Sequence, residues 1–218
     1  MKNKKMLTAL IWTALTFCFT VLIKVVDVQT IGPNGSSVGF AAINGKVADW
    51  LGVRMVWYDF SKVLGILAIL LAVFIAFMGG WQWIRERDLK KVNYRFFAAA
   101  GLYAATFILY VLFDKIAVNY RPILVNDVLA PSYPSTHTML GLVLFGSAVP
   151  FIRACLPSGN AGKIITACCC GFGVLTVITR FLSGYHWLTD IVGGIFFAGM
   201  LLDWYRVALD FFRKKLGE

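Results

Sequence analysis

The chain has 218 residues, of which 59% are hydrophobic and 15% are charged, and its mean hydropathy is +0.75. This composition excludes an ordinary soluble domain and is typical of a single-domain membrane protein with several spans. The net charge of +10 does not indicate a nucleic-acid-binding protein, because the basic residues flank apolar runs and do not gather on a soluble face.

Six apolar runs are long enough to span a membrane. The first follows a short basic N-terminus; a cleaved signal peptide is the alternative, but no small-x-small cleavage site follows and more spans come later. We therefore predict an all-α fold, a six-span transmembrane helical bundle that forms one domain over residues 1–218. The predicted spans are 6–26, 63–83, 96–113, 136–152, 164–179 and 187–208.

Residues 27–60 form the longest connection between predicted spans. The segment 31–37 is rich in Gly, Asn and Ser and predicts turns. Residues 38–57 mix apolar and charged side chains, and Trp50 and Trp57 predict a short helix at the membrane interface. The connection is either an element that controls lipid access or an ordinary surface loop.

Basic residues indicate how the bundle is oriented in the membrane. Six spans place both termini on one side, and 14 of the 21 Lys and Arg residues lie in the termini and the even-numbered loops. By the positive-inside rule both termini are cytoplasmic, and the remaining loops face the extracytoplasmic side of the plasma membrane. The 14 residues are Lys2, Lys4, Lys5, Arg85, Arg87, Lys90, Lys91, Arg95, Arg153, Lys163, Arg206, Arg213, Lys214 and Lys215. The basic tail is predicted to run from Phe211 to Glu218.

Several other residues are expected to serve packing or charge pairing. The five cysteines lie within or beside apolar runs without metal-binding spacing, so we interpret them as small packing residues. In the last span, Gly193-Gly194 predicts close helix packing. Asp203 and Asp210 are predicted charge partners of Arg206 and Arg213.

Reactive side chains concentrate in three clusters at span ends on the predicted outer side. These are residues 115–122, 134–138 and 179–190. The two histidines of the chain, His137 and His186, lie in the second and third clusters. An ionisable residue at membrane depth indicates function by default, although any single one is often a packing residue.

The three clusters contain the groups that a phosphate ester needs. Lys115, Arg121 and Arg180 would supply positive charge and N–H donors for phosphoryl oxygens. Ser135 and the amide of Thr136 would begin the fourth span, and a helix N-terminus favours an anion. No carboxylate cluster is available for magnesium, so we expect the three cations to neutralise the transition state, with no metal and no cofactor.

The histidines have separate predicted roles. His186 is placed to attack phosphorus, and Asp190 at i+4 would fix its tautomer if a helix begins at Ser183-Gly184 with Ser183 as its cap. His137 would donate a proton to the departing alkoxide. A nucleophile that must be neutral and an acid that must be protonated predict a bell-shaped pH–rate profile.

The clusters resemble the type 2 phosphatidic acid phosphatase superfamily, which also includes vanadium haloperoxidases. Its signature is a Lys…Arg-Pro block, then Pro-Ser-Gly-His, then Ser-Arg-x5-His-x3-Asp. The corresponding blocks here are Lys115-x5-Arg121-Pro122, Pro134-Ser135-Thr136-His137 and Thr179-Arg180-x5-His186-x3-Asp190. Thr replaces Ser in the third block and Gly in the second, and the first gap is one residue shorter than the usual six. One residue rotates a helical side chain by about 100°.

This resemblance covers residues 115–190 and the six-span layout. It implies that the phosphate-binding residues are Lys115, Arg121, Ser135, Thr136 and Arg180. It also implies that His186 is the nucleophile that forms a phosphohistidine, His137 the acid and Asp190 the partner of His186.

The resemblance implies an integral-membrane phosphatase acting on a lipid phosphate or diphosphate: phosphatidic acid, phosphatidylglycerol phosphate or undecaprenyl diphosphate. Its partners would be this lipid and the bilayer, with no nucleic acid. Two alternatives stay open. The same site would serve a lipid-to-lipid phosphotransferase, or a non-catalytic protein that binds or transports lipid phosphates. The sequence does not indicate an oligomeric state.

Overall fold

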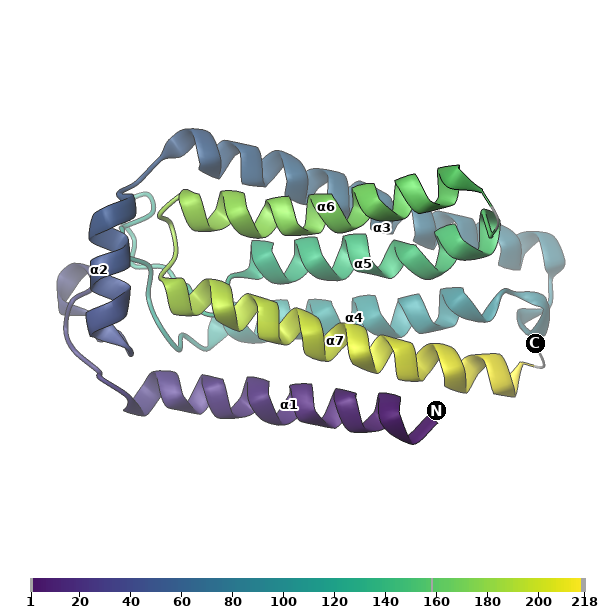
Figure 1. Ribbon diagram of the computed structural model, residues 1–218, viewed down its shortest axis with the longest axis horizontal. Helices are drawn as coiled ribbons and strands as arrows, with labels where there is room; N and C mark the ends of the chain where they lie inside the picture. Colours follow the sequence, from purple (N-terminus) through teal and green to yellow (C-terminus); the bar gives the residue numbers. More distant parts are fainter. Residues whose placement is uncertain (1, 158, 217–218) are drawn as a thin grey trace.

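The computed structural model describes residues 2–157 and 159–216, and it is all-helical over that part of the chain. Six helices are long and apolar enough to cross a membrane, as predicted, and they lie side by side in one bundle (Figure 1). Their bounds are α1 Lys2–Val25, α3 Met55–Glu86, α4 Tyr94–Lys115, α5 Thr136–Cys155, α6 Asn160–Leu182 and α7 Leu188–Lys215. Two single 3-10 turns, Pro33–Gly35 and Leu89–Lys91, lie in connections.

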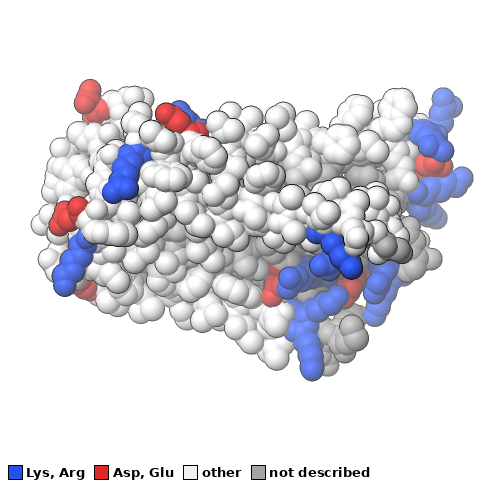
Figure 2. Space-filling view, turned by 45° about the horizontal axis from the view of Figure 1, so that its top comes forward, with Lys and Arg blue, Asp and Glu red and all other residues white. Residues whose placement is uncertain are grey.

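The core of the bundle is built around α5 and α7, which are the most buried of the six helices. The other long helices present large apolar side chains outward, including Phe17, Ile66 and Phe77. Figure 2 shows the result, a wide band without charge between two charged ends. Such a continuous apolar surface fits hydrocarbon, where every backbone polar group must be bonded within its own helix.

The predicted spans all exist, but the helices are longer than their apolar runs. The largest difference is in α3, which begins eight residues before the predicted Val63 and continues past Gly79-Gly80. A glycine inside a helix costs only about 1 kcal/mol relative to alanine, and at Gly79 it allows the ring of Phe96 from α4 to approach closely. Gly79 therefore serves packing, and neither glycine ends the helix.

The predicted packing and charge-pairing residues of α7 are confirmed. A Cβ at Gly193 would overlap the Tyr133 ring, so the loop before α5 lies directly against α7. Arg206 bonds Asp203 at 2.7 Å, and Arg213 lies 3.6 Å from Asp210. The predicted basic tail is largely the end of this helix, and residues 217–218 lie outside the described residues.

The predicted short helix after the first span is α2, Ala41–Leu51, which runs across the end of the bundle (Figure 1). Trp50 on this helix is 71% exposed, whereas Trp57 belongs to α3. Asn44 is buried and donates to Thr189 Oγ1 at 2.9 Å, while its Oδ1 accepts from the Thr189 amide at 3.2 Å. The helix α2 is thus fixed to the beginning of α7.

Candidate functional site

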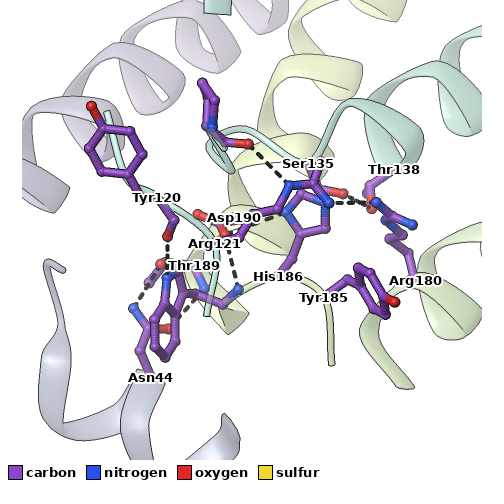
Figure 3. Close-up of polar contacts among 12 residues, drawn as sticks. Asn44, Tyr120, Arg121, Ser135, Thr138, Arg180, Tyr185, His186, Thr189 and Asp190 are labelled. Atoms are coloured by element: carbon purple, nitrogen blue, oxygen red, sulfur yellow. Dashed lines mark hydrogen bonds and ion pairs between the residues drawn. The ribbon is translucent and has the colours of Figure 1, made fainter. Parts of the chain in front are cut away.

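Two loops and the beginnings of two helices meet at the α2 end of the bundle. The loop of residues 116–135 leads into α5, and the short loop of residues 183–187 joins α6 to α7. The two are joined directly, since the Ser135 amide donates to the Asp190 carbonyl at 2.9 Å and Trp187 Nε1 donates to the Tyr120 carbonyl at 2.6 Å. This junction brings residues of the second and third sequence clusters together (Figure 3).

The beginning of α5 presents free donors. Ser135 is fully buried and precedes the helix as its N-cap, and its Oγ accepts a hydrogen bond from Thr138 at 3.0 Å. The Ser135 hydroxyl hydrogen is therefore free to donate. The amides of Thr136 and His137 lie in the first turn, where an amide has no carbonyl four residues earlier to bond. This arrangement is suited to binding an anion.

His186 is held outside any helix, which corrects one expectation. The last helix begins at Leu188 with Trp187 as its N-cap, and Ser183 instead ends α6, donating to the Arg180 carbonyl at 2.7 Å. The Asp190 carboxylate is recruited as the N3 residue of α7 and accepts from the Trp187 amide at 2.9 Å. Ser183 does not cap α7, because its side chain bonds the Arg180 carbonyl at the end of α6 and Trp187 holds the N-cap position of α7.

His186 and Asp190 nevertheless lie next to one another, although no hydrogen bond joins them. Nδ1 of His186 lies 3.5 Å from Asp190 Oδ2, and both residues are buried. On the other side of the ring, Nε2 lies 3.0 Å from Nη2 of Arg180. A guanidinium only donates, so Nε2 carries a lone pair and the ring proton belongs on Nδ1, facing the carboxylate. Burial, with the nearby charges of Arg180 and Arg121, holds the pKa of His186 well below its ordinary value.

The two arginines lack negative partners. Arg180 is 1% exposed; its Nη1 lies 3.4 Å from Ser61 Oγ, and its Nε has no hydrogen-bond partner among the described residues. Arg121 is half-buried and donates through Nε to the Pro131 carbonyl at 3.2 Å, and burial lowers its pKa. Neither guanidinium lies within ion-pair distance of a carboxylate in residues 2–157 and 159–216. An unpaired buried cation is costly, so this site is built for an anion.

A cavity of about 720 Å³ lies beside these residues. Arg121, Thr136, His137 and His186 line one part of it. The rest is lined mainly by apolar side chains of α3 and α4. Some of these side chains also lie on the outer surface of the bundle; for example, Val73 is 57% exposed and Phe107 is 66% exposed. The cavity therefore connects the polar site with the apolar outer surface.

Lys115 does not join the cluster. It ends α4 with 77% of its side chain exposed and pairs with the adjacent Asp114 at 3.7 Å. A six-residue gap counted back from Arg121 reaches Asp114, which does line the cavity. The shortened gap thus rotates the lysine away from the site, as the 100° per residue of a helix requires.

Sequence reasoning missed several residues that surround the site. Asn119 and Ser132 are buried beside the Asp190 carboxylate, and Asn119 Nδ2, Ser132 Oγ and Asp190 Oδ1 have no hydrogen-bond partner among the described residues. Tyr58 of α3 stacks on Tyr185 with ring centroids 4.1 Å apart. Asn119 lies within the first cluster, but nothing in the sequence connects residues of α3 with it.

Comparison with known proteins gives the family. The sequence profile of the PAP2 superfamily matches residues 96–214, more than half of the chain. The chain belongs to the PAP2 superfamily. All three clusters lie within the matched residues, whereas α1, α2 and α3 precede them. Membership in this superfamily, together with the six apolar helices, supports a multi-pass membrane phosphatase.

A solved structure extends the likeness to the whole fold. It is the crystal structure of a transmembrane PAP2-type phosphatidylglycerolphosphate phosphatase from Bacillus subtilis, 17% identical to this PAP2 protein. The alignment covers 95% of this chain and 96% of that one, with a TM-score of 0.60. At this identity the likeness establishes the fold alone. A comparison with curated protein sequences gave no match.

Proposed function

We propose that this PAP2 protein is a metal-independent lipid phosphatase that hydrolyses a phosphomonoester or diphosphate lipid through a phosphohistidine at His186. One observation carries the proposal. Two guanidiniums, neither of which has a carboxylate partner among the described residues, lie beside two histidines at the edge of a largely apolar cavity. A phosphoryl group supplies the missing negative charge, and a lipid chain fits the apolar wall. The phosphate and the lipid chain of one substrate would thus occupy the polar and the apolar parts of the same cavity.

The polar groups have complementary tasks in the proposed reaction. Arg121 and Arg180 bind phosphoryl oxygens, and the Ser135 hydroxyl and the first amides of α5 donate to the same group. Binding draws the Arg180 guanidinium from Nε2 of His186 to the phosphate, which frees the lone pair. The lone pair then forms the N–P bond while the ester P–O bond breaks, and His137 gives its proton to the leaving oxygen.

Hydrolysis of the intermediate reverses the proton transfer. His137, now neutral, accepts a proton from water, whose oxygen attacks phosphorus as the N–P bond breaks. The Asp190 carboxylate stabilises the positive charge on His186 while the phosphohistidine exists. Inorganic phosphate leaves and both histidines return to their starting states.

We further propose that the site faces the extracytoplasmic side. Lys and Arg crowd the end of the bundle that holds both termini, and the site lies at the opposite end (Figures 1 and 2). The positive-inside rule assigns the crowded end to the cytoplasm. Substrates would then come from the outer leaflet of the plasma membrane.

The test is release of phosphate by the purified protein in EDTA from phosphatidic acid, phosphatidylglycerol phosphate and a polyprenyl diphosphate. We expect time-dependent release by the wild type and none by His186→Ala. A radiolabelled substrate, quenched rapidly, should leave an acid-labile, base-stable label on the wild type only. Equal release by the variant would refute the nucleophile assignment.

The same assay separates the alternatives. Label that passes to a second lipid in place of water would identify a phosphotransferase. Lipid phosphate bound without turnover would identify a non-catalytic binding protein.

A further inference from the structure

Lys62 of α3 lies on the side of that helix that faces the site. Ser61, its neighbour, is in contact with Arg180, with Oγ and Nη1 3.4 Å apart. Three residues after Lys62, a Cβ placed on Gly65 would lie 3.5 Å from Cδ2 of His137. Side chains of a helix lean toward its N-terminus, which for α3 is the end of the bundle that holds the site.

The ammonium group of Lys62 is close to the cations already described. Its Nζ lies 4.7 Å from the centroid of the Tyr58 ring, and Cζ of Arg180 lies 5.1 Å from the same centroid. Tyr185 stacks on one face of that ring. These distances place Lys62 beside Tyr58, within one helical turn of the two residues of α3 that lie against Arg180 and His137.

Lys62 is free to change partners. Its Nζ now pairs with Asp59 at 2.8 Å, and the two side chains are 47% and 58% exposed. An exposed ion pair of this kind contributes little stability, so a more highly charged anion would displace the carboxylate. Lys115 is more exposed, with 77% of its side chain exposed, and it is paired with the adjacent Asp114.

The direction of the proposed reaction assigns a role to this position. His186 attacks from one side of phosphorus, and the leaving oxygen departs on the opposite side, where His137 protonates it. A cation beside His137 therefore stabilises negative charge on the leaving group. Diphosphates and phosphatidylglycerol phosphate have a phosphate in their leaving group, whereas the diacylglycerol released from phosphatidic acid is uncharged.

We propose that Lys62, in place of Lys115, is the third cation of the site and favours lipids whose leaving group carries a phosphate. This inference rests on the proposed function, which supplies the direction of attack. Arg121 and Arg180 hold the transferred phosphoryl group, and Lys62 binds the second phosphate.

The experiment compares wild type, Lys62→Met, Lys62→Arg and Lys115→Met, with Lys46→Met on the exposed face of α2 as a matched control. For phosphatidylglycerol phosphate and a polyprenyl diphosphate, Lys62→Met should lower kcat/KM about tenfold or more, the usual effect of losing a charged hydrogen bond. For phosphatidic acid the loss should be about threefold or less, and Lys62→Arg should retain most activity. Lys46→Met should match wild type on all three lipids.

A binding measurement keeps the inference independent of turnover. Titration of the purified proteins with pyrophosphate and with inorganic phosphate should show that Lys62→Met weakens pyrophosphate binding about tenfold and phosphate binding much less. An equal loss for both ligands, no loss for either, or a loss confined to Lys115→Met would overturn the proposal. If no lipid is hydrolysed by wild type, the proposed function fails and the pyrophosphate titration still decides the role of Lys62.

Discussion

Replacing Gly184 by alanine should disturb both stability and catalysis. Gly184 has a φ of +69° in the loop that carries His186, and a Cβ there would overlap the carbonyl oxygen of Gly52 and lie 3.3 Å from the Cα of Val53. The left-handed backbone alone costs an L-residue about 1–2 kcal/mol. Forcing atoms into a closely packed contact adds about 1–3 kcal/mol. We therefore expect a total loss of about 2–5 kcal/mol.

Gly35 is the matched control. Its φ is +71°, but a Cβ there would meet no atom within 4 Å, so Gly35→Ala has only the backbone cost of about 1–2 kcal/mol. In thermal unfolding, Gly184→Ala should melt about 2–12 °C below Gly35→Ala, since the additional cost of about 1–3 kcal/mol corresponds to about 2–4 °C per kcal/mol at this chain length. The phosphatase rate should fall only in Gly184→Ala, because the bond from the Arg54 amide to the Ser183 carbonyl, 3.0 Å long, must move with it. Equal melting temperatures for the two variants would refute the reasoning.

Two further outcomes follow from the same contacts. Burial lowers the pKa of His186, so its ring stays neutral in the folded protein but takes up a proton in the unfolded protein below about pH 6.5. The free energy of unfolding should therefore fall by up to about 1.4 kcal/mol per pH unit below that value. For the same reason, the acid limb of kcat/KM should lie below the ordinary histidine range. Unfolding from pH 7.5 to 5 measures this, and a His186→Asn variant with the same acid sensitivity would contradict it. The Tyr133 hydroxyl lies 2.8 Å from Thr20 Oγ1, and burial raises its pKa to about 12. Thr20→Val leaves this hydroxyl without a partner and should lower the free energy of unfolding by about 1–3 kcal/mol. Unchanged thermal stability would show that another group replaces the threonine.

The six spans were predictable because each depends on a local property. A run of apolar residues specifies a span wherever it lies, so the sequence located every long helix. The helix ends were less predictable, since α3 continues through Gly79-Gly80 and Gly79 packs against Phe96, a contact with a different span. Hydropathy contains no information on such contacts.

The site shows the same division. His137, His186, Arg121 and Arg180 come together at the loop junction, as their clustering at span ends indicated. The predicted cap of α7 was wrong. Serine is a common N-cap residue, but Ser183 ends α6 instead, and the Asp190 carboxylate accepts from the amide of Trp187, three residues before it. Lys62, Tyr58 and Ser61 were missed because a helix far away in the sequence delivers them.

Both ends of the polypeptide lie at the end of the bundle opposite the candidate site (Figure 1). A fluorescent or enzymatic reporter fused to Lys2 or to Lys215 would therefore extend from the membrane face opposite the chemistry. Neither fusion would cover the candidate site, and activity of a reporter that works only inside the cell would place that site outside it. The even number of crossings makes the two fusions independent checks of one another.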